Sequence, residues 1–308
     1  MPDWQERITD DTRPAVRAEH ELRYALAAPL IRASARWCDL GCGTGLGAVA
    51  ALGDAAYDGS ALLVDREQAV ADRAAAAVQA RETVALVADL SDQAGVSRVR
   101  EALATPPKTS ARARRAAAGS GPGVSLLVTC FETIEHLSDF APLVALLVEL
   151  AARPATTVLL SVPNDAFWSV ENPHHQTTWG EGAVRELRTL LPADHVMLHQ
   201  VALQGSAIVV AGTSADVAAE VALAPAVPSH VLLAFGAGAG QLGGPATRVV
   251  QADVEAQRRW ERQRESDLLF YETSVRALEQ RLAAAGASAG AAPQDGDADS
   301  APAANGHA

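Results

Sequence analysis

Several features that would direct a chain to a particular class of protein are scarce or missing in this sequence. Three of its 308 residues are cysteines, and no two of them form a CxxC pair, so a disulfide framework is not predicted. No apolar run reaches the roughly 18 residues expected of a membrane-spanning helix. The first residues, MPDWQERITDD, are charged and acidic, unlike a secretory signal. We therefore expect a cytoplasmic protein that does not insert into a membrane.

Net basic charge is also missing. Lysine and arginine number 25 against 37 aspartates and glutamates, which gives a formal net charge of −12. A general nucleic-acid binder needs a basic surface for phosphate contacts, so nucleic acid is not the expected partner. Aromatic residues make up 4% of the chain, but hydrophobic residues make up 49%. The length suffices for one large domain or two ordinary domains with a real core.

Strand-like and helix-like segments alternate along the chain, which predicts βαβ units and a parallel sheet with helices on both faces. The strands are expected at 36–40, 61–65, 83–88, 124–130 and 156–162. The helices are expected at 14–33, 45–53, 66–80, 92–104, 139–152 and 181–190. Two more strands, at 195–202 and 205–211, have a connection too short for a crossover helix, so they are expected to form an antiparallel hairpin.

This pattern also predicts the domain organisation. The sheet would be complete by about residue 212, so residues 1–212 are expected to form one domain, with a flexible, basic surface insertion at 105–123. Residues 213–247 are interpreted as an extension and linker, and residues 285–308 as a disordered tail. Residues 248–284 are predicted to form a long helix. Its apolar residues Leu268, Tyr271, Val275, Leu278 and Leu282 follow a partial heptad, which favours a coiled coil between two chains over packing on its own domain.

The stretch WCDLGCGTGLG, residues 37–47, is a glycine-rich turn directly after the first strand. A phosphate-binding P-loop would end in Gly-Lys-Ser/Thr, and a dinucleotide fingerprint would carry a third glycine where Leu46 stands. Instead, Asp39 precedes the three alternating glycines Gly41, Gly43 and Gly45. An acid at that place would repel a phosphate and suits a cationic ligand with an ammonium or sulfonium group.

The segment CDLGCGTG resembles motif I of the class I S-adenosylmethionine-dependent methyltransferases. The resemblance extends through LLVDRE, VALVADLSD, VSLLVTCFETIEHL and VLLSVPN, and covers roughly residues 14–212. It implies S-adenosylmethionine as the cofactor and a Rossmann-like α/β sheet of seven strands in the order 3-2-1-4-5-7-6, with strand 7 antiparallel. It also implies that Asp65 accepts hydrogen bonds from the ribose hydroxyls and Asp89 from the adenine amino group. The cofactor-binding residues expected on this basis are Asp39, Gly41, Cys42, Gly43, Gly45, Asp65, Arg66, Asp89, Leu90 and Cys130.

Candidate catalytic residues follow the fourth and fifth strands, at the edge of the sheet where ligands bind in such folds. If 132–136 is a helical turn, Glu132, Glu135 and His136 share one face, and His175 lies in the next loop. We predict Glu132, His136 and His175 as catalytic residues, with His136 as a base beside the acceptor. As an alternative, Glu132, Glu135, His136 and His175 would bind Mg²⁺, because the pattern is similar to that of small-RNA 2′-O-methyltransferases.

The stretch ENPHHQTTWGEGAVRELRTLLP resembles bacterial methyltransferases that act in glycan and lipid pathways. The expected function is therefore O-methylation of a sugar hydroxyl or related small acceptor in a bacterial glycan or secondary-metabolite pathway. The expected partners are a small-molecule or glycan acceptor and a second copy of the chain, bound through 248–284. Two alternatives remain open: a metal-dependent RNA 2′-O-methyltransferase, and a catalytically silent partner subunit that keeps the cofactor fold.

Overall fold

The structure is a computed structural model. It describes residues 7–9, 12, 14–53, 56–106, 125–168, 172, 174–201, 227–242, 266 and 268–283. The chain divides into one unit that spans Met1–Gln251 and a second that spans Ala252–Ala308. Most of the insertion predicted at 105–123, the strand predicted at 205–211 and the tail predicted at 285–308 lie outside the described residues.

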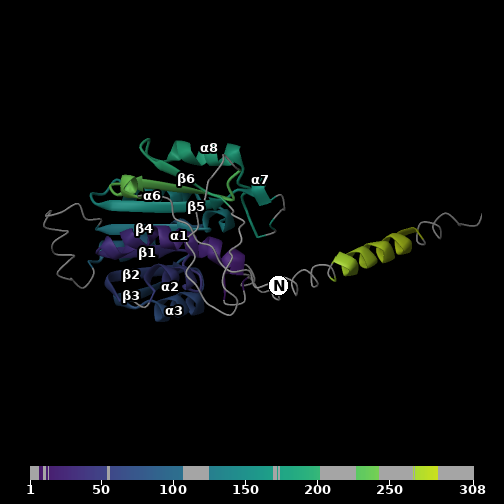
Figure 1. Ribbon diagram of the computed structural model, residues 1–308, viewed down its shortest axis with the longest axis horizontal. Coiled ribbons are helices and arrows are strands. Elements are labelled where there is room, and N and C mark those ends of the chain that lie inside the picture. Colours follow the sequence, from purple (N-terminus) through teal and green to yellow (C-terminus); the bar gives the residue numbers. More distant parts are fainter. Residues whose placement is uncertain are drawn as a thin grey trace, which may run out of the picture. The chain divides into compact units, whose positions relative to one another are not determined.

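The first unit is built around a seven-stranded sheet (Figure 1). The strands are β1 (Arg36–Leu40), β2 (Tyr57–Asp65), β3 (Ala80–Val87), β4 (Leu126–Phe131), β5 (Thr156–Pro163), β6 (Val196–Gln200) and β7 (His230–Gly236). Their order in the sheet is β3-β2-β1-β4-β5-β7-β6. Strands β1 to β5 pair in parallel, and β7 is antiparallel to both of its neighbours, β5 and β6. The predicted fold class is confirmed.

The position of the antiparallel strand was predicted wrongly. The strand that lies between β5 and β6 is His230–Gly236, with His230 paired to both Pro163 and Gln200. Residues 201–229 therefore connect β6 to β7, in place of a tight hairpin. The segment His230–Gly236 is buried along nearly its whole length, as a central strand should be. It belongs to the stretch 213–247 that was interpreted as extension and linker, so the sheet is not complete at residue 212.

Helices cover both faces of the sheet, as predicted. On one face, α1 (Pro14–Ala33), α2 (Leu46–Leu52) and α3 (Gln68–Ala77) pack around the buried rings of Tyr24 and Trp37. On the other face lie α4 (Gln93–Ala104), α6 (Ala141–Ala151) and α8 (Glu181–Leu190). The shorter elements are η2 (Ile134–His136), α7 (Asp165–Trp168) and η3 (Ala239–Gln241).

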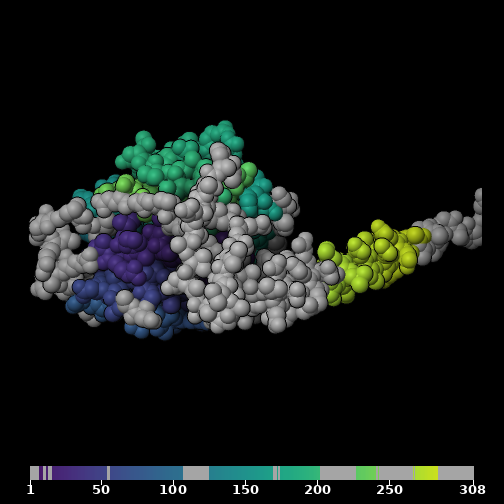
Figure 2. Space-filling model, viewed as in Figure 1, coloured from purple at the N-terminus to yellow at the C-terminus, as the bar shows by residue number. Residues whose placement is uncertain are grey.

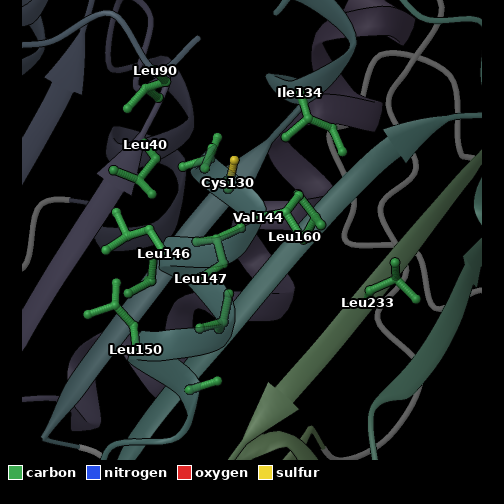
Figure 3. Packing of buried hydrophobic residues seen from close by; sticks show 14 of the residues in the cluster. Leu40, Leu90, Cys130, Ile134, Val144, Leu146, Leu147, Leu150, Leu160 and Leu233 are labelled. Carbon is green, nitrogen blue, oxygen red and sulfur yellow. The ribbon is translucent and has the colours of Figure 1, made fainter. Parts of the chain in front are cut away.

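The larger of the two apolar clusters packs α6 against β4 and β5, the strands that lead to the site. Helix α6 directs Leu146, Leu147 and Leu150 at the middle of the sheet, where Cys130 and Leu160 meet them (Figure 3). Strands β4 and β5 are buried on both faces, which explains their continuous apolar sequences.

In the space-filling view, the purple N-terminal residues lie between the blue residues around β2 and α3 and the teal residues of α8 (Figure 2).

In the second unit, residues 266 and 268–283 are helical, whereas 248–265 lie outside the described part. The heptad residues Leu268, Tyr271, Val275, Leu278 and Leu282 are exposed on this helix. Within the described ranges, no helix combines the length and the apolar character needed to cross a bilayer.

Candidate active site

A cavity of about 960 Å³ opens at the carboxyl ends of the parallel strands. This is the edge at which open α/β sheets bind their ligands, and the volume is at the upper end of the roughly 300–1,000 Å³ usual for small-molecule sites. We call one part of it the glycine-loop end, which Gly41, Gly43, Asp65 and Asp89 line. The other part, which Glu132, His136, His175 and His230 line, we call the histidine end.

The glycine loop has a conformation that other residues rarely adopt. Gly41 has φ +76°, and a Cβ there would overlap the Thr133 side chain. Gly41 and Cys42 both donate their backbone N–H to the Val64 carbonyl, at 2.9 Å each, which holds the loop against the end of β2. Gly45 does not line the cavity; a Cβ there would meet Cα of Ala74 at 2.8 Å, so this glycine allows α2 to approach α3.

The structure does not bring Asp39 to the cavity, contrary to prediction. Asp39 and Trp37 alternate with Cys38 and Leu40 along β1, and Asp39 faces α1. Its carboxylate accepts hydrogen bonds from the Tyr24 hydroxyl at 3.0 Å and from Thr129 Oγ1 at 2.6 Å. Burial raises the pKa of the Asp39 carboxyl to about 7, although both hydrogen bonds act to lower it. Asp39 therefore links β1 to α1 and to β4.

Asp65 and Asp89 do line the cavity, together with Arg66 and Leu90. Asp65, at the end of β2, accepts hydrogen bonds through Oδ1 from the Glu67 N–H at 3.0 Å and from Arg7 Nη2 at 3.1 Å. Asp89 is exposed and accepts from the hydroxyl and the N–H of Ser91, which lowers the pKa of its carboxyl. Both groups thus present hydrogen-bond acceptors to a ligand.

The two cysteines of the predicted cofactor site are placed differently. Cys42 lines the cavity, and burial raises the pKa of its thiol well above its usual value, so it is present as a neutral thiol. Cys130 lies on the face of β4 that packs against α6 and does not line the cavity.

At the histidine end, a contact with the backbone of His174 orients the ring of His136. Its Nδ1 lies 3.3 Å from the His174 carbonyl oxygen. A carbonyl can only accept a hydrogen bond, so this contact places the ring proton on Nδ1 and leaves Nε2 as the basic nitrogen. Nε2 is 3.9 Å from Oε1 of Glu135, whose side chain is 1% exposed, whereas the His136 side chain is 31% exposed. The arrangement can take a proton from a ligand and balance the resulting charge.

Glu135, His136 and His175 form a cluster that could hold a metal ion, since one ligand atom from each lies within 4.8 Å of the others. The rings of His136 and His175 stand edge to face with centroids 5.1 Å apart. His175 is also engaged by protein groups: its Nε2 lies 3.0 Å from the Asn172 amide nitrogen and its Nδ1 lies 3.5 Å from Asp165 Oδ1. Trp179 stands directly before Gly180, the N-cap of α8, and is 1% exposed, so it belongs to the core.

Glu132 does not share a face with Glu135 and His136, contrary to prediction. The helical turn begins only at Ile134, and Glu132 precedes it with φ +50°. Its carboxylate accepts a hydrogen bond from Ser161 Oγ at 2.7 Å, and its Oε2 lies 3.1 Å from His230 Nε2. Burial acts to raise the pKa of the Glu132 carboxyl, but Arg23 and His230 outweigh it and hold that pKa well below its usual value. Glu132 is thus an anion outside the metal cluster.

Several cavity residues were not predicted from the sequence. His230 is the first residue of β7, the strand whose position was predicted wrongly, and no local pattern in the sequence marks this histidine. His20 and Arg23 lie on one face of α1, and Arg23 donates to Gln200 Oε1 at 2.9 Å. Burial, with Arg23 alongside, lowers the pKa of His20 to about 3, so its ring is neutral. An i, i+3 pair of polar residues on an otherwise apolar helix face is a signal that could have found them.

Comparison with known proteins identifies the family. A family model described as "Methyltransferase domain" matches residues 15–288. None of the curated proteins matches the chain. Solved structures with a similar fold include the O-methyltransferase TomG from Streptomyces achromogenes, involved in tomaymycin synthesis, with 16% identity over 71% of this chain and 79% of that one and a TM-score of 0.38. They also include the small RNA methyltransferase HEN1, with 14% identity over 79% of this chain and 27% of that one and a TM-score of 0.45.

A third structure is the O-methyltransferase from Bacillus cereus in complex with S-adenosylhomocysteine, with 11% identity over 74% of this chain and 84% of that one and a TM-score of 0.39. Identities and scores this low say nothing about the acceptor. The family model, by contrast, spans most of the chain, so the chain belongs to the methyltransferase domain family. It is a class I S-adenosylmethionine-dependent methyltransferase, as its sequence motifs predicted.

Proposed function

We propose that this enzyme transfers a methyl group to a hydroxyl of a sugar or a related small acceptor, with His136 as the base. The observation that carries the proposal is the orientation of the His136 ring, whose Nδ1 faces the His174 carbonyl and whose Nε2 is the basic nitrogen. A hydroxyl acceptor must lose its proton as it is methylated, and a positioned imidazole is the side chain most often used for that task. Glu135, 3.9 Å away, would balance the imidazolium charge.

For the cofactor, we infer that S-adenosylmethionine lies at the glycine-loop end. Among the residues that the structure describes, none would have an atom within 4 Å of a Cβ on Gly43 apart from its chain neighbours, so the backbone there is open to a close approach by the ligand. Asp65 and Asp89 provide the acceptors that a ribose diol and an amino group require. The cofactor supplies an electrophilic methyl group, so the chain's own residues mainly orient the acceptor, exclude water and remove a proton.

The histidine end has the chemistry to bind a hydroxyl-rich acceptor. Glu132 is ionised and fixed by Ser161 and His230, so it can accept hydrogen bonds from ligand hydroxyls. Trp168 of α7 lines the same end with 38% of its surface exposed, and its ring stands edge to face with that of His230 at 5.8 Å. An exposed indole beside a fixed carboxylate suits a sugar ring, which offers both an apolar face and hydroxyls.

A screen for methyl transfer tests this function. Enzyme and labelled S-adenosylmethionine would be incubated with nucleotide sugars, free glycans, small phenols, amines and short RNAs, and each product would be mapped by mass spectrometry. We expect label on a carbohydrate or other small-molecule oxygen, and none when His136 is replaced by alanine. Label on nitrogen, or on RNA alone, would contradict the proposal.

The cluster of Glu135, His136 and His175 supports a second candidate, a metal-dependent O-methyltransferase of the kind that acts on RNA 2′-hydroxyls. Carboxylate and imidazole ligands would accept Mg²⁺ or Mn²⁺, and the imidazoles also suit Zn²⁺ or Fe²⁺. In that case a chelator abolishes activity and one of these ions restores it. The base role of His136 predicts full activity after exhaustive chelation.

We also propose self-association through residues 248–284, of which 266 and 268–283 are helical in the structure. The exposed side chains of Leu268, Val275 and Leu278 lie at heptad spacing, which suits the same helix of a second copy. Light scattering of Leu278→Glu against Gln280→Glu, two neighbours on different faces, tests this. We expect the first substitution to halve the mass and the second to leave it unchanged; equal masses for both would end the proposal.

A further inference from the structure

A short stretch of the N-terminal segment, residues 7–9, lies along the glycine-loop end of the cavity. Arg7 and Ile8 both line it. Arg7 Nη2 is 3.1 Å from Oδ1 of Asp65 and 2.9 Å from Oε1 of Glu67. The Thr44 hydroxyl, within the glycine loop, donates to the Ile8 carbonyl at 2.8 Å. This segment therefore contacts both the loop after β1 and the acid that ends β2.

The ion pair of Arg7 differs from an ordinary surface pair. The side chains of Arg7 and Asp65 are 15% and 7% exposed, so solvent screens their attraction only in part. Without the guanidinium, the carboxylates of Asp65 and Glu67 would stand near each other with no cation between them. A carboxylate that is this buried needs a partner to keep its charge and its orientation.

The contacts leave room for a ligand on the same carboxylate. Arg7 and the Glu67 N–H both use Oδ1 of Asp65. Within the described part of the chain, Oδ2 accepts no hydrogen bond, and Asp65 lines the cavity. A carboxylate has about four lone-pair positions, so it can hold a guanidinium on one oxygen and a diol on the other.

We propose that Arg7 is a positioning residue for the cofactor: it fixes the Asp65 carboxylate by Oδ1 so that Oδ2 meets the ribose hydroxyls, and Arg7 and Ile8 complete the cavity wall. The inference rests on the proposed role of Asp65 but not on the identity of the acceptor. Thr44 has a supporting part, since its bond to Ile8 holds the segment against the glycine loop.

Calorimetric titration with S-adenosylhomocysteine tests the proposal on the full chain. Arg7→Ala should weaken binding about three- to tenfold, less than the full value of a hydrogen bond to a charged group because Arg7 acts on the ligand through Asp65, and Arg7→Lys should recover part of that loss. Thr44→Val keeps the side-chain shape and should weaken binding by a smaller factor. The matched control is Arg81→Ala, which removes an exposed arginine paired with Asp58 and should leave the affinity unchanged. Thermal melts confirm that each variant is folded.

A double-mutant cycle separates positioning from mere packing. If Arg7 acts through Asp65, Arg7→Ala should change affinity less than twofold in an Asp65→Asn background. Factors that multiply in the double variant would mean that Arg7 acts independently of Asp65 and would overturn the proposal. So would unchanged affinity in Arg7→Ala, or tighter binding, which would make Arg7 a competitor of the ribose. Unchanged affinity in Asp65→Asn alone would reject both this inference and the assignment of Asp65, while leaving the base role of His136 open to its own test.

Discussion

The glycine-loop end of the cavity is bounded mostly by residues at or just after the ends of β1, β2 and β3. The histidine end differs, because its side chains come from α1, from the turn after β4, from the loop after β5 and from the start of β7. At the first end, a backbone turn and two carboxylates define the shape. At the second, each carboxylate is held beside an imidazole: Glu135 beside His136 and Glu132 beside His230. Under the proposed assignment, the cofactor would be met mostly by local backbone, and the acceptor by side chains that only folding brings together.

The largest effect should come from His136, at the histidine end. His136→Ala should lower kcat by about 10²–10⁴-fold, the usual contribution of general acid–base catalysis, without changing the affinity for S-adenosylhomocysteine. His174→Ala is the matched control, because it keeps the backbone carbonyl that orients the His136 ring. Single-turnover rates and calorimetry measure the two quantities. A loss of cofactor affinity equal to the loss of rate would break the separation of the two ends.

His230 tests whether the histidine end depends on the strand that completes the sheet. His230→Ala removes one of the partners of the half-buried Glu132 carboxylate, which should cost about 1.5–3 kcal/mol in the free energy of unfolding. It should also raise KM for the acceptor more than it lowers affinity for the cofactor. His199→Ala, at an exposed site on the adjacent strand, should do neither. Urea unfolding and acceptor kinetics decide the matter.

Asp65 is the corresponding test at the glycine-loop end. Asp65→Ala should weaken S-adenosylhomocysteine binding by about 1–3 kcal/mol, the cost of leaving polar groups without partners, and should leave KM for the acceptor nearly unchanged. Asp58→Ala, an exposed position on the same strand, serves as the control. If Asp65→Ala bound S-adenosylhomocysteine as tightly as Asp58→Ala does, the assignment of the ribose to this end would be wrong.

The smallest effect on ligand binding should come from Asp39, whose carboxyl contacts Tyr24 and Thr129 and does not line the cavity. Because burial raises the pKa of the Asp39 carboxyl from its usual 3.8 to about 7, the native state holds a proton between these pH values that the unfolded state has lost. The free energy of unfolding should therefore fall as pH rises through this window, by up to about 1.4 kcal/mol per pH unit from this group. In Asp39→Asn that slope should be shallower. Identical slopes in both proteins would show that Asp39 is ionised throughout.

The sequence alone determined strands β1 to β5, the helices that cover them and most of the glycine-loop end, because each depends on a short window. The range predicted for β1, 36–40, and the helix range predicted as 14–33 agree with the structure, since apolar periodicity and flanking turns are local signals. Asp65 and Asp89 were predicted from the resemblance of their segments to the methyltransferase family, and both line the cavity at the edge where the carboxyl ends of the parallel strands meet. No local signal distinguished Asp39 from them, and only its position on the α1 face of β1 shows that it points away from the cavity.

The tertiary structure decided the histidine end and the strand beside it. The segment 230–236 pairs with β5, although residues 201–229 separate it from β6 in the sequence. Whether 205–211 or 230–236 takes the position beside β5 depends on packing over the whole sheet. The position of Glu132 followed from this choice, because its partner His230 is the first residue of β7. Contacts between residues nearly a hundred positions apart leave no periodic trace in either segment, so spacing alone grouped Glu132 with Glu135 and His136. The long-range ion pair of Glu132 with His230, which no local pattern shows, separates Glu132 from Glu135 and His136.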